Sequence, residues 1–153
     1  MTLDNKPVLK GGCQCGAVRF TLEGRPGDAS ICHCRMCQKA FGNVFAALVS
    51  VGSAHLRWAG AEPSRFRSSN HVLRGFCPRC GTPLTYEAPD GVALAIGAFD
   101  DPAGLPPVVQ YGTEGKLPYT DGLPDLPGRP TTDDHEGLAW LADIRSCQHP
   151  DHD

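Results

Sequence analysis

The sequence predicts a mainly β, antiparallel fold with a short C-terminal helix, in one domain of 153 residues. The 18 Gly and 14 Pro make up about a fifth of the chain, a content typical of many turns and short strands. Apolar and polar residues alternate in several short segments, and turn signals recur at intervals of roughly eight to twelve residues. A hydrophobic content of 41% with 20% charged residues is that of a globular protein.

Eight segments are expected to be strands. In the first, Val18, Phe20 and Leu22 alternate with polar residues, which predicts that one face is buried. A turn at Pro89-Asp90-Gly91 joins two of the later segments into a hairpin. In chain order the expected strands cover residues 17–24, 43–51, 55–60, 64–69, 72–77, 83–88, 92–99 and 108–112.

The C-terminal part has a different pattern. Residues 112–130 are rich in Pro and Gly and aperiodic, which predicts a long loop over the body or a tether. Residues 131–146 predict a helix, because Asp133 and Glu136 can form a capping box and apolar residues follow at helical spacing. We therefore expect a β domain at 1–130 and, in the same domain, a helix with a frayed tail at 131–153.

Charge and hydropathy exclude several classes of partner. Residues 131–153 carry six acidic side chains against one basic residue, Arg145. Because the whole chain has a net charge of only −3, the first 130 residues are weakly basic. No basic–aromatic stripe points to nucleic acid, and no run approaches the ~18 apolar residues of a membrane span. The start, "MTLDNKPVLKGG", lacks the apolar segment of a secretory signal. We expect a cytoplasmic protein without nucleic-acid or membrane partners, whose thiols stay reduced.

Seven of the eight cysteines fall in three tight groups. In a reducing compartment such groups indicate metal ligands or catalysts rather than disulfides. A C-x-x-C turn followed by Gly81 is typical of a zinc knuckle, in which backbone N–H groups can face the sulfurs. A structural zinc takes four ligands, with sulfur at about 2.3 Å, whereas a catalytic zinc takes three and keeps one position open. The three groups are Cys13 with Cys15, Cys32 with Cys34 and Cys37, and Cys77 with Cys80.

The economical division of these thiols is four plus three. The cysteine quartet (Cys13, Cys15, Cys77 and Cys80) would form a closed structural zinc site, worth on the order of 10 kcal/mol of folding free energy. The cysteine triplet (Cys32, Cys34 and Cys37) would hold a second zinc with an open position. Two other divisions remain open. The C-x-x-C pair could join two thiols of the triplet, or all seven could share a binuclear cluster.

Three motifs carry a resemblance to a known family. "GGCQCGAVRF", "CHCRMCQKAFG" and "RGFCPRCGTPL", in this order, resemble the glutathione-dependent formaldehyde-activating enzyme family, which includes the centromere protein V domain. "GAFDDP" (97–102) and "DGLPDLP" (121–127) resemble its later landmarks. The resemblance runs from about residue 11 to 127. It implies a tent-like β fold related to zinc-ribbon proteins, with the quartet as structural zinc ligands and the triplet as the catalytic group.

The resemblance also implies an activity. Family members are carbon–sulfur lyases that reversibly join glutathione with formaldehyde, and their second zinc can be lost when glutathione binds. Three thiolates make a zinc site that is a weak Lewis acid but a soft site for sulfur. We therefore expect a glutathione-like thiol and a small aldehyde as the partners of the triplet. A non-catalytic, zinc-stapled binding module and a redox or zinc-relay protein are the alternatives.

Other side chains near the cysteines have expected roles. Arg35, inside the triplet, could pair with a glutathione carboxylate or remain a solvated charge. His33 would point away from the metal in an extended C-x-C, which makes it a packing or surface residue. Arg74 and Arg79 flank the knuckle and are expected to offset thiolate charge at the structural site. The aromatic residues expected in the core are Trp58, Phe66, Tyr86 and Phe99.

Overall fold

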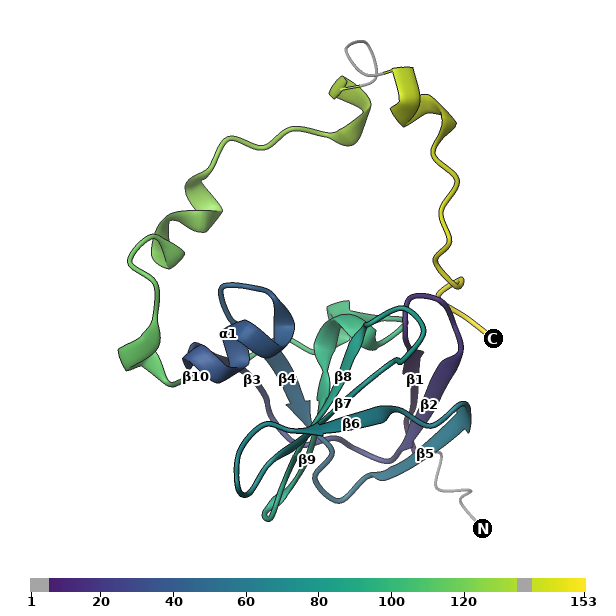
Figure 1. Ribbon diagram of the computed structural model, residues 1–153, viewed down its shortest axis with the longest axis vertical. Helices are drawn as coiled ribbons and strands as arrows, with labels where there is room; N and C mark the ends of the chain where they lie inside the picture. The colour runs from purple at the N-terminus through teal and green to yellow at the C-terminus, as the bar shows by residue number, and fades with distance from the viewer. Residues whose placement is uncertain (1–5, 135–138) are drawn as a thin grey trace.

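A computed structural model describes residues 6–134 and 139–153, and these residues form ten strands in two sheets (Figure 1). The smaller sheet has the order β1-β2-β5, and the larger one has the order β10-β3-β4-β9-β8-β7-β6. The mainly β fold predicted from the sequence is confirmed. The strands are β1 (Val8–Gly12), β2 (Val18–Glu23), β3 (Ala29–Cys32), β4 (Ala46–Ser50), β5 (His55–Gly60), β6 (Ser64–Arg67), β7 (Leu73–Phe76), β8 (Pro83–Ala88), β9 (Gly91–Ala95) and β10 (Val109–Tyr111).

One strand pair in the larger sheet departs from the antiparallel pattern. β10 runs parallel to β3, with Val109 opposite Ser30 and Tyr111 opposite Cys32. All other strand pairs within the described residues are antiparallel. This parallel pair brings residues far apart in sequence beside the first cysteine of the triplet.

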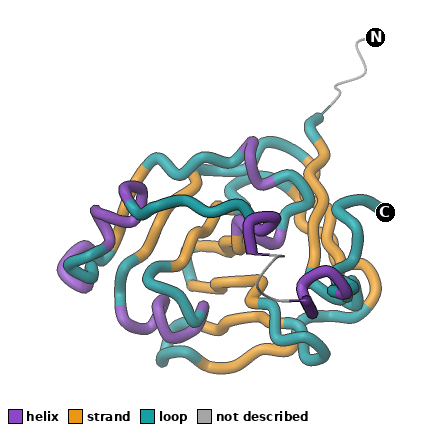
Figure 2. The backbone as a smooth tube through the Cα atoms, turned by 90° about the horizontal axis from the view of Figure 1, so that it is seen from above, coloured by secondary structure: helices purple, strands orange, loops and turns teal. Residues whose placement is uncertain are grey.

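Within residues 6–134 and 139–153, helical structure is limited to short elements. The α-helix α1 spans Arg35–Phe41, with Cys34 as its N-cap, and ends at Gly42 in the left-handed conformation at φ +56°. Tube colouring in Figure 2 separates these short helical elements from the strands. None of the helices among the described residues is long and apolar enough to cross a membrane. The 3₁₀ helices are Ile96–Ala98, Pro102–Gly104, Thr113–Gly115, Thr120–Asp125, Thr131–Asp134 and Ala139–Asp143.

The core lies between the two sheets. Val18, Phe20 and Leu22 of β2 are fully buried, as their alternation predicted. The Phe20 ring packs edge-on against Trp58 and Phe99, with centroid distances of 5.9 and 5.0 Å. The expectation of a core position is wrong for Phe66, which is 44% exposed. It lies on β6, the edge strand of the larger sheet, where no further strand covers it.

The C-terminal part differs from the single helix expected over 131–146. Two short 3₁₀ helices, Thr131–Asp134 and Ala139–Asp143, stand there, and the capping partner Glu136 lies outside the described residues. The preceding loop arches away from the sheets before the chain returns beside β1 and β2 (Figure 1).

The tail, expected to be frayed, contacts the β1–β2 turn. His149 N–H donates to the carbonyl of Gln14 at 2.6 Å. The Asp153 carboxylate pairs with Lys10 and, at 3.1 Å, with Arg19. These polar contacts give the tail a defined position on the smaller sheet.

Candidate functional site

Two turns bring the cysteine quartet together. Cys13 and Cys15 lie between β1 and β2, and Cys77 and Cys80 lie between β7 and β8. The Sγ atoms of Cys13 and Cys15 are 3.6 Å apart, and those of Cys15 and Cys77 are 3.8 Å apart. All four Sγ atoms lie within 4.8 Å of one another. The quartet therefore joins the two sheets through residues distant in sequence.

The quartet fits a tetrahedral metal ion. Four sulfurs at 2.3 Å from a zinc ion would be about 3.8 Å apart, which is close to the spacing found. Backbone N–H groups of Val18 and Arg79 donate to the sulfurs of Cys13 and Cys77 at 3.3 and 3.4 Å. Such donors favour thiolates over thiols.

The thiols of the quartet differ in acidity. Burial raises the pKa of Cys13 to about 12. Although burial alone would raise the pKa of Cys80, hydrogen bonding to Thr82 lowers it to about 6. Four adjacent thiolates repel one another, so the fully deprotonated quartet requires a cation among the sulfurs.

The cysteine triplet is assembled at the junction of β3 and α1. Cys32 ends β3, Cys34 caps α1, and Cys37 lies three residues further, on the same side of the first turn. Their Sγ atoms lie within 4.8 Å of one another. The Cys37 N–H donates to Cys34 Sγ at 3.4 Å, so the cap orients one sulfur of the triplet.

Burial and hydrogen bonds separate the acidities of these thiols. Burial raises the pKa of Cys32 to about 12. Burial also acts to raise the pKa of Cys34, but hydrogen bonds from the Cys37 backbone and the neighbouring thiols lower it below its ordinary value. Of these two, Cys34 is therefore the one that loses its proton first.

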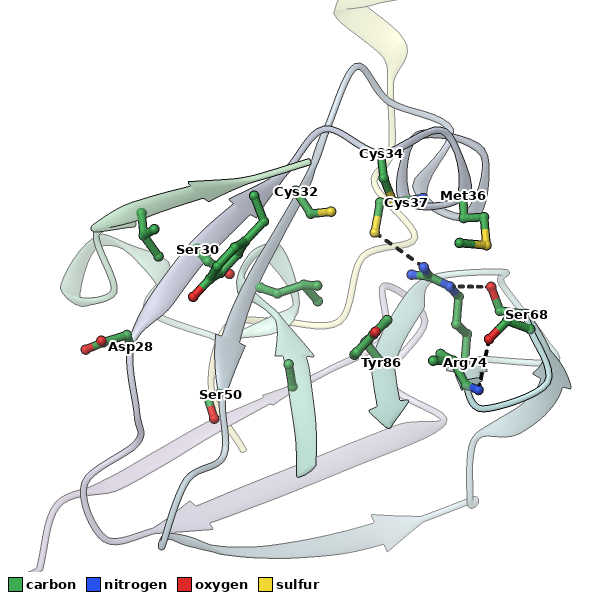
Figure 3. Close-up of a pocket in the computed structure, with 16 residues that line it drawn as sticks. Asp28, Ser30, Cys32, Cys34, Met36, Cys37, Ser50, Ser68, Arg74 and Tyr86 are labelled. Atoms are coloured by element: carbon green, nitrogen blue, oxygen red, sulfur yellow. Dashed lines mark hydrogen bonds between the residues drawn. The ribbon is translucent and has the colours of Figure 1, made fainter. Parts of the chain in front are cut away.

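A cavity of about 480 Å³ opens beside the triplet (Figure 3). All three triplet cysteines line it, whereas the quartet, whose residues are all described, is not part of its lining. The remaining walls combine apolar side chains with a few polar ones. The apolar lining residues include Met36, Leu48, Val72, Val109 and Tyr111, and the polar ones include Asp28, Ser30, Ser68 and Arg74. The triplet thus faces space that a small molecule can enter.

Arg74 of β7 lies at the triplet rather than at the quartet, where the sequence analysis expected it. Its Nη2 donates to Cys37 Sγ at 3.3 Å and its Nε donates to Ser68 Oγ at 2.9 Å. The guanidinium carbon is 5.0 Å from the ring centroid of Tyr86, the cross-strand partner of Arg74 on β8. Three residues of extended strand span about 10 Å, which separates this side chain from Cys77.

The other basic residues near the cysteines lie outside the cavity lining. His33 is buried, its Nε2 is 2.7 Å from Gln110 Oε1, and its ring packs edge-on against Phe45, as expected for a packing residue. Arg35 is exposed and donates to Gln38 Oε1 at 2.6 Å. Its pairing with a carboxylate stays a prediction. The side chain of Arg79 is exposed.

Gln38 is a structural residue of the site that the sequence analysis missed. Its side chain is buried, and its Nε2 donates to the carbonyls of His33 and Gly115 at 2.6 and 2.9 Å. It thereby ties α1 to the 3₁₀ helix Thr113–Gly115 that follows β10. No pattern in the sequence marks this glutamine, because its partners are backbone atoms, one of them 77 residues away.

Fold and site together define a class of protein: a two-sheet β domain with one cluster of four cysteines and a second cluster of three that faces a cavity. The chain belongs to the glutathione-dependent formaldehyde-activating enzyme family, whose model matches residues 8–114. This match includes all seven cysteines of the quartet and the triplet.

Two individual proteins are similar to this chain. A curated protein of Halomonas elongata, named provisionally as a glutathione-dependent formaldehyde-activating enzyme, is 33% identical over 87 residues, which are 50% of this chain and 54% of that protein. The chain thus spans about half the length of that relative. A crystal structure of a Rhodobacter sphaeroides protein matches with a TM-score of 0.51 at 25% identity, covering 66% of this chain and 98% of the other.

Proposed function

We propose that this protein is a carbon–sulfur lyase that reversibly joins glutathione, or a similar small thiol, with formaldehyde or another small aldehyde. One observation carries the proposal: three clustered thiols line a cavity, while the four other clustered thiols form a set of their own away from it. Membership of the family supports the same reaction class.

The reaction is an addition without oxidation or reduction. The sulfur of the incoming thiol forms a bond to the carbonyl carbon, the carbonyl π electrons move to oxygen, and the thiol proton ends on that oxygen. The product is a hemithioacetal, and its breakdown to thiol and aldehyde is the lyase direction of the reaction. Leu48, Val72 and Val109 give the cavity an apolar part that offers water no hydrogen bonds.

We further propose two zinc sites. The quartet would hold a structural ion, and the triplet would hold a second, labile one, with Arg35 available to a carboxylate of the thiol. Bound at the triplet, Zn²⁺ would supply an open coordination position at which a thiol loses its proton. The chain contributes the three sulfurs, with Cys34 oriented by the N-terminus of α1.

The test is adduct formation by variants of the triplet. Exchange between ¹³C-formaldehyde hydrate and S-hydroxymethylglutathione is measured by NMR with wild-type protein, Cys34→Ser and Cys37→Ser. Cys147→Ser is the matched control, because this exposed cysteine belongs to neither cluster. Zinc per chain is counted with and without glutathione.

We expect wild type and Cys147→Ser to accelerate the exchange and both triplet variants to lose the acceleration while staying folded. Unchanged exchange in folded triplet variants would contradict the proposal. A wild-type protein that binds zinc but neither binds glutathione nor accelerates exchange would favour a non-catalytic binding module instead.

A further inference from the structure

One polar atom in the cavity wall lacks a partner. The Arg74 side chain is only 3% exposed, and two of its three nitrogens donate, to Cys37 and to Ser68. Its third nitrogen, Nη1, is buried without a hydrogen-bond partner within the described part of the chain. A buried donor left unpaired costs about 1–3 kcal/mol, so such a group is rarely retained without a partner in some state of the protein.

The position of this donor points to a particular atom of the ligand. Nη1 shares one carbon with Nη2, which touches Cys37 Sγ, and Figure 3 shows the guanidinium directed toward Cys37 and the cavity. In a thiol–aldehyde adduct the former carbonyl oxygen is two bonds from the sulfur. The carboxylates of glutathione are many bonds away. With the ligand sulfur beside the triplet, the carbonyl oxygen would therefore arrive within reach of a donor next to Cys37.

Neighbouring side chains hold the guanidinium in this orientation. Ser68 accepts from Nε on one side, and the Tyr86 ring lies against the guanidinium, with the carbon 5.0 Å from the ring centroid. A donor held in place before the reaction stabilises developing charge without the cost of reorganisation. The apolar residues of the cavity wall strengthen this interaction, because they lower the local dielectric.

We propose that Arg74 is a catalytic residue whose Nη1 donates to the aldehyde oxygen as it gains negative charge. This inference rests on the proposed function and adds to it the residue that stabilises the oxyanion. As sulfur adds to carbon, the electron pair of the C=O π bond collects on oxygen. That charge is held by the guanidinium until the oxygen takes up the proton released by the thiol. The reverse reaction uses the same contact.

The test compares Arg74→Met and Arg74→Lys with wild type, and Arg74→Ala serves for rescue by an added guanidinium. Arg67→Met is the matched control, because it removes an exposed arginine from the neighbouring strand outside the cavity. The rate of adduct exchange is measured with formaldehyde and either glutathione or 2-mercaptoethanol, which has no carboxylate. The Kd of glutathione is measured by calorimetry, and zinc content and thermal unfolding are measured for every variant.

Loss of one oxyanion donor lowers kcat by about 100- to 1,000-fold. We expect that loss in Arg74→Met with both thiols, a glutathione Kd within about twofold of wild type, and an intermediate rate in Arg74→Lys. Millimolar methylguanidinium should restore part of the rate of Arg74→Ala and leave wild type unchanged. A structural role alone would not respond to the added guanidinium.

Three results would overturn the inference. Equal rates in Arg74→Met and wild type would show that the guanidinium does not act on the reaction. A rate loss seen with glutathione but not with 2-mercaptoethanol, with a weakened Kd, would assign Arg74 to a thiol carboxylate. If wild type itself accelerates neither reaction, the proposed function fails first, and this inference fails with it.

Discussion

Removing one sulfur from the quartet should destabilise the protein far more than removing one from the triplet. The informative pair is Cys77→Ser and Cys34→Ser. Cys77 is fully buried between the two sheets. Cys34 is the N-cap of α1, and serine is itself a favoured N-cap residue, so its substitution keeps the first turn of the helix capped.

The expected magnitudes follow from the lengths of chain that each cluster closes. Cys15 and Cys77 are 62 residues apart, and a cross-link over that distance restricts the unfolded chain by about 4 kcal/mol. The triplet closes a loop of only a few residues, for which the same relation gives about 2 kcal/mol. For a chain of this size these values correspond to a Tm lower by about 8–16 °C and about 4–8 °C.

The value of about 4 kcal/mol for the quartet is a lower bound on the loss of folding free energy. A structural zinc contributes on the order of 10 kcal/mol, and a small domain has a total stability of about 5–15 kcal/mol. Thermal unfolding followed by circular dichroism, with zinc counted in each preparation, measures both effects. The reasoning is refuted if Cys77→Ser unfolds at the same temperature as Cys34→Ser, or if Cys77→Ser keeps its full zinc content.

Three further predictions concern the core and the tail. Phe20→Ala should cost about 3–5 kcal/mol, measured by urea unfolding, because its buried ring packs against two other aromatic rings; a loss under 1 kcal/mol would contradict this packing. Gly16→Ala should release the tail, since φ is +77° there and an added Cβ would overlap the His149 ring; unchanged hydrogen exchange in residues 146–153 would contradict it. Hydrogen bonding to Lys10 lowers the pKa of Asp153. The tail contact should thus persist above the ordinary pKa of about 3.8 and be lost as the pH falls further, which the NMR shifts of His149 can follow.

The sequence predicted the features that depend on local periodicity, such as the buried face of β2, or on the number of cysteine ligands, such as the quartet. The alternation in β2 identified its buried face, because the residues of the opposite face, Arg19, Thr21 and Glu23, are all polar and only half-buried. The quartet could be proposed because four sulfurs satisfy a tetrahedral ion whatever the path of the chain between them. Neither inference required knowledge of how distant strands pair.

Features that depend on distant pairing did not show in the sequence. β3 has four residues and α1 has seven, lengths at which strand and helix periodicity give little signal. The parallel pairing of β10 with β3 joins segments about 80 residues apart. The position of Arg74 depends on the pairing of β7 with β8, which places Arg74 opposite Tyr86. This register decides on which face of the sheet the guanidinium lies.

The two clusters differ in where a fourth sulfur would come from, and this difference has consequences for their charge. In the quartet all four sulfurs come from the chain, a donor set that would suit the proposed structural zinc ion. Four thiolates around a zinc ion would leave two negative charges, which the backbone donors to Cys13 and Cys77 would partly offset. At the triplet a ligand thiolate would add the same charge beside the buried Cys37, where an uncompensated charge is costly. Arg74 supplies a buried positive charge at that place, which would let the triplet accept the fourth sulfur of the proposed reaction and release it again.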